Sequence, residues 1–553
     1  MNSLSSFELT TSNSFKKENN ESYFSKNNLL KQKEDKRLTL RKESISDLIK
    51  AKRFVNIDSL EKNYCIDINS VELKSYKEEI TKITEELNLK DIMTMLKYLE
   101  ENKQSTDLIK FYLYHLKLYL KKQPNTQDNK YEKVTYVLCL LLKSFINDKV
   151  IIYEVLGLLT NLISEIMSIN KIKIIIYCDK TFKIFSLILD HYSNINRISN
   201  KVDKVIIEQF LFLLGNISGE GNDQFNTYLF NNKIHLLCLN LINSLSTNDT
   251  KVTKPCIWII SNILNNLTED KTNSLNEHSN LFINTLNRLF TNNEDVITYL
   301  VDCLKILYRL TYYGSKVYIN AIIESELLSN IFEISLEEDE DMFPSKLIAC
   351  RLIGNLLMGE LVEIKKLIRL GVIETIKNVL LKVNISEENS QKIAKELIWS
   401  ISNICTETME LINYLEDQGI FIIIIKIALL GFNQSKSLLM TSILRECLYS
   451  LGNAILGSTT EVQFNLVKYG IVDIFLLGIR EFCNKDFQLI KLVLKSINML
   501  SRLEDNAMID GSLDIKNTII NDKIYDELSD FMHEAKNEEV VLMCEKVLNE
   551  IKF

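Results

Sequence analysis

The chain has 553 residues, of which 46% are hydrophobic and 25% are charged, with only 15 Gly and 3 Pro. This length is too great for one compact core, and the scarcity of Gly and Pro argues against a protein built of many sheet turns. Residues 1–55 carry 12 Lys/Arg and 7 Asp/Glu, whereas the remainder carries 53 and 66, so an acidic body follows a basic segment. An acidic body disfavours nucleic acid as a partner and favours basic partners.

The N-terminal part precedes the periodic region and divides into three expected segments. Residues 1–30 are rich in Ser, Asn and Lys and lack periodicity, which predicts a disordered tail. Residues 31–57 can form a basic amphipathic helix with Leu40, Ile45 and Leu48 on one face, and residues 58–90 are expected to be a linker. The first residues, MNSLSSFELT, lack an apolar signal core, and the longest apolar run, 419–430, is too short for a membrane span.

Residues 91–524 repeat one pattern, in which helical signatures alternate with short polar breaks. An Asn recurs along this region in steps of 45 to 50 residues, with one step of 55 and one doubled step. HEAT and armadillo repeats have about 40–47 residues. Several units end in a Gly before a new apolar helix, at Gly371, Gly419 and Gly470, and a Gly there fits a left-handed helix C-cap. The recurring residues, called slot residues below, are Asn161, Asn216, Asn262, Asn355, Asn403, Asn453 and Asn498.

This spacing predicts an all-α fold, a right-handed armadillo-repeat superhelical solenoid of about ten repeats. The repeats are expected over residues 91–524, with capping helices over residues 525–553 that shield the open end of the stack. The 11 Cys contain no CxxC pair and mostly fall in apolar helical runs. We therefore expect buried thiols in a reducing compartment.

Most slot Asn residues have an aromatic residue one helical turn earlier, on the same helix face. The chain has only two Trp residues, and both stand four positions before a slot Asn. An Asn amide has two donors and two lone pairs, so it can hold the backbone of an extended peptide, while aromatic rings accept the aliphatic stems of Lys or Arg. The pairs are Phe212 with Asn216, Trp258 with Asn262, Trp399 with Asn403, and Tyr449 with Asn453. Candidate carboxylates for the charged tips are Glu220, Glu396 and Glu446.

A purely structural interpretation competes with this one. A repeated Asn can form an internal ladder that only satisfies backbone groups between repeats. A Trp on an apolar helical stripe usually belongs to the core. The coincidence of both Trp residues with the Asn slot favours the binding interpretation.

Sequence signatures of catalysis are missing. The five His residues are far apart and form no HExxH motif. The segment GNISGEGN (215–222) is rich in Gly, but it lacks a GK[ST] ending and follows a helix rather than a strand. With no Gly-x-Ser-x-Gly elbow either, we expect no enzyme, no metal and no cofactor.

The segments FLFLLGNISGEGN (210–222), CIWIISNI (256–263), CRLIGNLLMG (350–359), KELIWSISNI (395–404) and RECLYSLGNAILGSTTEVQ (445–463) resemble successive repeats of importin-α (karyopherin-α), the armadillo adaptor of nuclear import. MLKYLEENKQSTDL (95–108) and KKQPN (121–125) resemble its first repeat. LKQKEDKRLTLRKESISDLIKAKRFV (30–55) resembles its importin-β-binding segment. The resemblance covers nearly the whole chain after residue 30.

The resemblance implies an adaptor that binds Lys/Arg-rich nuclear localisation signals in its inner groove, binds importin-β through its N-terminal arm, and shuttles between cytoplasm and nucleus. It also implies a nuclear export receptor for recycling. From the short apolar runs we expect no membrane partner. The implied major-site residues are Asn161, Phe212, Asn216, Glu220, Trp258 and Asn262. The implied minor-site residues are Arg351, Asn355, Glu396, Trp399, Asn403, Glu446, Tyr449 and Asn453. The implied importin-β-binding residues are Arg37, Leu40, Arg41, Lys42, Lys50, Lys52 and Arg53.

The sequence departs from the family pattern at several positions. Gly157 replaces a Trp of the family, so one wall of the major site is missing. Lys305 and Arg309 stand between the two sites, where they would repel a basic cargo, and we hypothesise that cargo relies more on the minor site. The alternative function is an armadillo scaffold for protein–protein assembly without a transport role. Binding of importin-β to residues 31–55 distinguishes the two functions.

Overall fold

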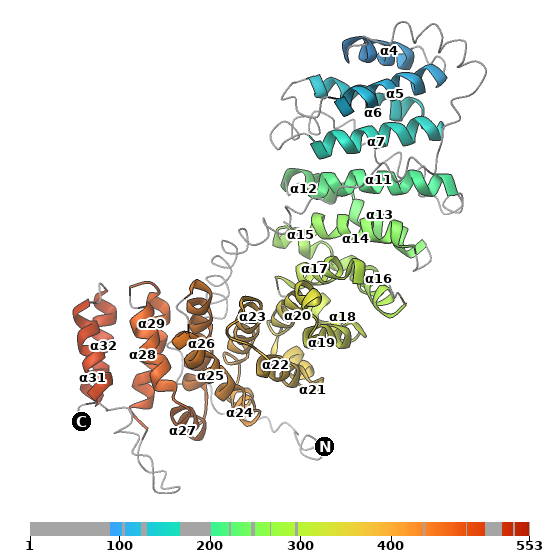
Figure 1. Ribbon diagram of the computed structural model, residues 1–553. Helices are drawn as coiled ribbons and strands as arrows, with labels where there is room; N and C mark the ends of the chain where they lie inside the picture. The colour runs from blue at the N-terminus through green and yellow to red at the C-terminus, as the bar shows by residue number, and fades with distance from the viewer. Residues whose placement is uncertain are drawn as a thin grey trace. The chain divides into compact units, whose positions relative to one another are not determined.

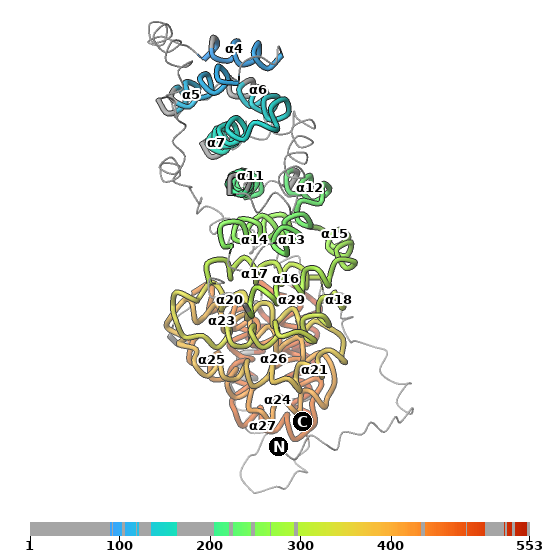
Figure 2. The backbone as a smooth tube through the Cα atoms, turned by 90° about the vertical axis from the view of Figure 1, so that its right-hand side faces the viewer, coloured from blue at the N-terminus to red at the C-terminus, as the bar shows by residue number. Residues whose placement is uncertain are grey.

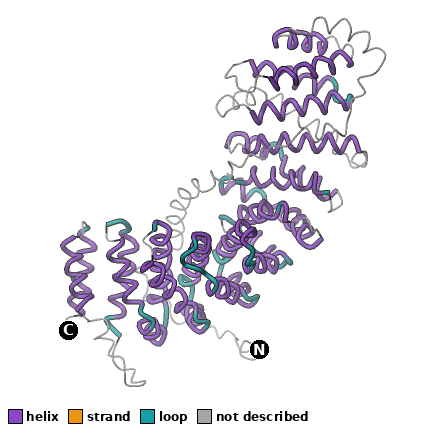
Figure 3. Tube along the Cα trace, viewed as in Figure 1, coloured by secondary structure: helices purple, strands orange, loops and turns teal. Residues whose placement is uncertain are grey.

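The computed structural model describes residues 89–101, 106–122, 130–165, 201–219, 223–244, 249–265, 267–292, 297–313, 315–434, 437–482, 484–503, 522–534 and 537–551. Within these ranges every regular element is a helix (Figure 1, Figure 3). The chain divides into two compact units, Met1–Asn56 and Ile57–Phe553, and the described residues all belong to the second. The expected tail (1–30), the expected basic helix (31–57) and nearly all of the expected linker (58–90) lie outside the described residues.

Three-helix repeats make up the middle of the chain. The first helices of the repeats are α12 (Asp223–Asn231), α15 (Glu269–Asn273), α18 (Lys316–Ile323), α21 (Leu361–Arg369), α24 (Met409–Asp417) and α27 (Thr460–Lys468). The second helices are α13 (Ile234–Ser244), α16 (Ser279–Asn292), α19 (Leu327–Leu336), α22 (Val372–Leu381), α25 (Ile420–Gln434) and α28 (Ile471–Phe482). The third helices are α14 (Thr250–Leu264), α17 (Leu300–Thr311), α20 (Phe343–Leu356), α23 (Glu388–Ile404), α26 (Leu438–Gly457) and α29 (Phe487–Leu500).

Further helices lie before and after these repeats. Those before them are α4 (Leu89–Glu101), α5 (Thr106–Lys122), α6 (Lys130–Ser144), α7 (Lys149–Glu165) and α11 (Lys201–Gly219). Those after them are α31 (Asp522–Glu534) and α32 (Glu538–Ile551). Two short 3-10 helices, η2 (Asn276–His278) and η4 (Glu340–Met342), lead into α16 and α20.

Helices in equivalent positions stack on one another along the chain. We call one series of helices the ladder helices: α7, α11, α14, α17, α20, α23, α26 and α29. Each ladder helix packs against the next, and α32 packs against α29 (Figure 1). Figure 2 shows α7, α11, α14 and α17 one below another. The second helices form a parallel layer, in which each helix from α13 to α28 packs against its successor and α28 packs against α31. Three-helix repeats of this length, stacked only on their neighbours, form an armadillo-repeat solenoid.

The core lies between these two layers and consists mainly of Leu and Ile side chains. Helix α25 is mostly apolar and packs against α22, α26 and α28, while its Lys426 is exposed. Most of the apolar run 419–430 is therefore buried within a repeat. In the part of the chain that the structure describes, no single helix is long and apolar enough to cross a membrane; the bent pair α27 and α28 passes that test together on length and composition.

Left-handed glycines connect the first and second helices of three repeats. Gly371, Gly419 and Gly470 have φ angles of 93°, 71° and 93°, which confirms the C-cap prediction from the sequence. The same connection between α12 and α13 contains Lys233, whose φ of 58° is also positive. A residue with positive φ therefore connects the first and second helices in four repeats, and in one of them this residue is Lys233 instead of Gly.

We expect Gly371→Ala to lower the free energy of unfolding by about 1 kcal/mol, because a Cβ is strained at this positive φ. The matched control is Gly157→Ala on α7, where an added Cβ meets nothing within 4 Å. Ala is the better helix former, so the control should gain up to about 1 kcal/mol. Thermal unfolding followed by circular dichroism compares the two, and a Gly371→Ala protein as stable as the control would contradict the expectation.

Candidate functional site

The slot residues all lie on ladder helices, near their C-terminal ends. Asn161 is on α7 and Asn216 on α11, Arg309 takes the slot of α17, and Asn498 is on α29. Helices α14, α20, α23 and α26 carry Asn262, Asn355, Asn403 and Asn453. Because the ladder helices pack in series, the sequence period becomes a row of amide side chains running from repeat to repeat.

Both Trp rings lie against a glycine of the preceding ladder helix. A Cβ built on Gly215 would stand 2.3 Å from Cζ3 of Trp258, and one built on Gly354 would stand 2.4 Å from Cζ3 of Trp399. Trp258 is half-buried, whereas Trp399 is only 6% exposed. Each ring therefore contributes to packing between repeats, as the structural interpretation of a Trp on an apolar stripe would have it. The glycine immediately before the slot Asn was the sequence signal for this contact.

Two slot Asn residues donate to the preceding ladder helix. Asn262 Nδ2 lies 3.1 Å from Ser218 Oγ. Asn355 is fully buried, and its Nδ2 donates to Tyr308 O at 3.0 Å and to Thr311 Oγ1 at 3.3 Å. A ligand would reach these two amide nitrogens only by displacing existing hydrogen bonds.

Other slot Asn residues differ in this respect. Asn403 is 9% exposed and Asn453 is half-buried. The Nδ2 atoms of both are shielded from solvent, and no hydrogen-bond partner for either lies among the described residues. The same holds for Oδ1 of Asn498. An unmet buried amide atom is costly, so these residues have the chemistry to gain from a ligand backbone.

The two candidate carboxylates that the structure describes, Glu396 and Glu446, differ in their partners. Glu396 Oε1 accepts from Arg351 Nε at 2.9 Å, so two of the implied minor-site residues neutralise one another. Glu446 differs, because its Oε2 is buried and has no hydrogen-bond partner in the part of the chain that the structure describes. It lies one turn from Tyr449, whose pKa is raised to about 12, mainly by burial. Glu446 is therefore the carboxylate best suited to receive a cation.

The cations of α17 are held by their surroundings. Lys305 Nζ lies 3.1 Å from Asp302 Oδ1, so its charge is balanced locally. Arg309 donates to Asn265 Oδ1, and its guanidinium lies 5.6 Å from the ring centre of Tyr308. Burial lowers the pKa of Arg309 to about 10. The repulsion expected of Lys305 is weakened by this pairing, while Arg309 bonds back toward α14.

Three of the implied major-site residues, Asn161, Phe212 and Asn216, are half-buried. Glu220 lies outside the described residues. So do the implied importin-β-binding residues Arg37, Leu40, Arg41, Lys42, Lys50, Lys52 and Arg53. Their roles stay predictions.

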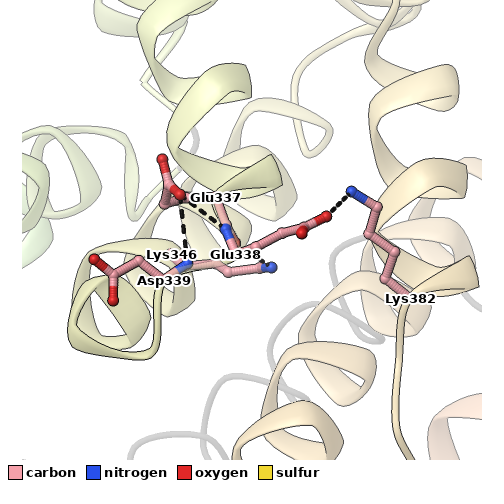
Figure 4. A network of polar contacts seen from close by, with 5 residues as sticks. All are labelled: Glu337, Glu338, Asp339, Lys346 and Lys382. Carbon is pink, nitrogen blue, oxygen red and sulfur yellow. Dashed lines mark hydrogen bonds and ion pairs between the residues drawn. The ribbon is translucent and has the colours of Figure 1, made fainter.

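An acidic turn that the sequence analysis did not predict as functional lies between α19 and α20 (Figure 4). The amides of Glu338 and Asp339 donate to Glu337 Oε1, and Lys346 Nζ donates to Glu337 O at 2.7 Å. Lys382, at the end of α22, reaches across to Glu338 and lowers the pKa of that carboxyl. The run EEDED at 337–341 was a visible signal, and in the structure it links two neighbouring repeats.

Comparison with known proteins gives likenesses of fold. No model of a known protein family matches the sequence. No curated protein matches it either. An engineered protein of known structure is 16% identical with a TM-score of 0.60, and the match covers 84% of this chain and 100% of that one. A designed armadillo repeat protein in complex with the peptide (KR)4 is 20% identical with a TM-score of 0.37, covering 49% of this chain and 98% of that one.

We expect Gly354→Ala to destabilise the protein by about 1–3 kcal/mol, because the added methyl overlaps the Trp399 ring most closely and also stands 2.8 Å from Ser400 Oγ. Removing the ring by Trp399→Leu should make room, so Gly354→Ala should cost less in that background. Unfolding midpoints of the four proteins of this double-mutant cycle measure the coupling. An equal cost of Gly354→Ala in both backgrounds would show that the ring is not what excludes the methyl group.

Proposed function

We propose that this chain is a nuclear import adaptor, which holds a Lys/Arg-rich localisation signal as an extended peptide along its ladder helices and joins the cargo to importin-β through its basic N-terminal segment. The observation that carries the proposal is the row of slot Asn residues on consecutive ladder helices, with unmet amide nitrogens at Asn403 and Asn453. It also rests on the resemblance of the repeats and of residues 30–55 to importin-α.

The chemistry of the row suits an extended peptide of any sequence. A carboxamide can donate to a peptide carbonyl and accept from a peptide N–H, and a row of them repeats this grip at each repeat. Specificity for Lys and Arg then requires carboxylates. Glu446 is a candidate, because its Oε2 has no hydrogen-bond partner among the described residues. The excess of acidic over basic residues after residue 55 would steer a basic segment toward the body.

In the proposed function, the basic N-terminal segment links the cargo complex to importin-β. Arg41, Lys42, Lys52 and Arg53 would bind importin-β, and the same basic segment, when released, would compete with cargo for the ladder. A short tether gives such a segment a high effective concentration. Shuttling between cytoplasm and nucleus, with return on an export receptor, follows from this cycle. An armadillo scaffold without a transport role would share the ladder but not the importin-β contact.

We expect Glu446→Gln to lower the affinity for a fluorescent Lys/Arg-rich peptide by about 3- to 10-fold and to reduce its dependence on salt, because one ion pair is lost. Glu374→Gln is the matched control, since Glu374 is an exposed carboxylate on α22, outside the ladder. Fluorescence anisotropy of the full chain measures both. A parent chain that binds neither the basic peptide nor importin-β would favour the scaffold.

We further expect the full chain to retain importin-β in a pull-down, and the quadruple variant Arg41→Ala, Lys42→Ala, Lys52→Ala, Arg53→Ala to lose it. Basic-peptide binding by the variant should persist or improve, because the competing segment is weakened. Equal retention of importin-β by parent and variant would remove the assigned role of the basic segment and leave peptide binding unaffected.

A further inference from the structure

Two ladder hydroxyls hold the slot Asn of the next ladder helix by the same geometry. Ser218 on α11 and Thr311 on α17 both stand two residues after the slot position of their own helix, and each accepts from an Asn 44 residues later. Ser218 Oγ also donates to Gly215 O at 3.0 Å, and Thr311 Oγ1 donates to Leu307 O at 2.9 Å. Each hydroxyl proton is thus directed into its own helix, and the oxygen faces the next helix as an acceptor.

The equivalent position is different ahead of Asn403 and Asn453. Two residues after the slot stand Leu357, the C-cap of α20, and Cys405, the C-cap of α23, so neither position offers a hydroxyl. Asn403 and Asn453 are the slot residues whose Nδ2 atoms are buried and unpartnered among the described residues. Presence of the hydroxyl coincides with a satisfied amide nitrogen, and its absence coincides with an unmet one.

We propose that the residue two positions after each slot decides whether the Asn of the next ladder helix can bind a peptide. A hydroxyl there gives the amide nitrogen a partner within the protein, as at Asn262 and Asn355, and we call such an Asn closed. An apolar side chain or thiol leaves the buried nitrogen without a partner among the described residues, as at Asn403 and Asn453, and we call such an Asn open. This inference rests on the proposed function, because it assigns the extended Lys/Arg-rich peptide to the open rungs on α23 and α26.

The physical reason is the difference between exchanging a hydrogen bond and gaining one. Asn262 must break its bond to Ser218 before it donates to a peptide carbonyl, and Asn355 must break its bonds to Thr311 and to Tyr308 O, so the net gain is small. An open Asn has no bond to break and is relieved of an unmet buried donor. Equal side chains at equal slots therefore differ in affinity because of a neighbour that never touches the ligand.

The role of the residue two positions after the slot can be tested by adding a hydroxyl at one such position and by removing it at another. Cys405→Ser adds a hydroxyl of nearly the same size ahead of Asn453 and should lower the affinity for the basic peptide by about 2- to 10-fold, which is the effect of one hydrogen bond. Ser218→Ala removes the hydroxyl that holds Asn262 and should raise the affinity for a peptide long enough to reach α14 by a similar factor.

The matched control is Cys350→Ser, the same replacement of a buried thiol on ladder helix α20, away from the position two residues after the slot. It should leave the affinity unchanged. Anisotropy titrations of the full chain, with melting temperatures for each variant, separate binding from stability.

The outcomes separate the two hypotheses. A parent chain that binds no basic peptide overturns the proposed function and this inference with it. If the parent binds, and Cys405→Ser binds as tightly as the parent, the inference alone is overturned. Should Cys405→Ser fail to fold, Ser218→Ala decides: unchanged affinity for the long peptide overturns the inference, and tighter binding supports it.

Discussion

The close approach of neighbouring ladder helices determines how the repeats pack and which slot amides form hydrogen bonds between repeats. Gly215 and Gly354 have no Cβ, and the rings of Trp258 and Trp399 occupy the space where one would be. Helices packed at this distance bring the slot amide within hydrogen-bond reach of the preceding helix, as Asn262 shows with Ser218. Such an amide has the neighbouring repeat as one partner, and in the proposed function a ligand is the other. The same residues that hold the repeats together determine which amides remain available.

Several charged residues on the ladder helices are likewise paired with a nearby residue of opposite charge. Arg351 is paired with Glu396, Lys305 with Asp302, and Arg445 Nη2 with Asp486 Oδ2 at 2.7 Å. These pairs are partly buried, so they fix side-chain geometry more than they add stability. The overall acidity of the chain after residue 55 acts at long range on the rate of encounter, whereas a specific cation needs an unpaired carboxylate. Sequence composition predicts the long-range attraction, but it does not show which carboxylates are unpaired.

Much of the architecture followed from period and residue type. The recurrence of Asn predicted equivalent helices, and the glycines at 371, 419 and 470 predicted left-handed turns, because both are properties of one repeat read along the chain. The pairing of Asn262 with Ser218 and of Asn355 with Thr311 depends on the register between two helices about 44 residues apart. The period locates such helices but does not fix their rotation or separation, so the division of the row into satisfied and unmet amides appears only in three dimensions.

Helix α17 extends this division. Its slot holds Arg309 in place of Asn, and the guanidinium donates to Asn265, a residue 44 positions earlier near the end of α14. It also lies 5.8 Å from the ring centre of Tyr312, in addition to the ring of Tyr308. Arg309 thus bonds backward along the ladder as Asn262 and Asn355 do, although its chemistry differs. Three consecutive ladder helices, α14, α17 and α20, are closed by contacts to their predecessors. Under the proposed function, an extended ligand that needs unpartnered amide nitrogens on adjacent ladder helices would bind at α23 and α26. Between that site and the helices before α14 lie three ladder helices whose slot side chains each donate to the preceding helix.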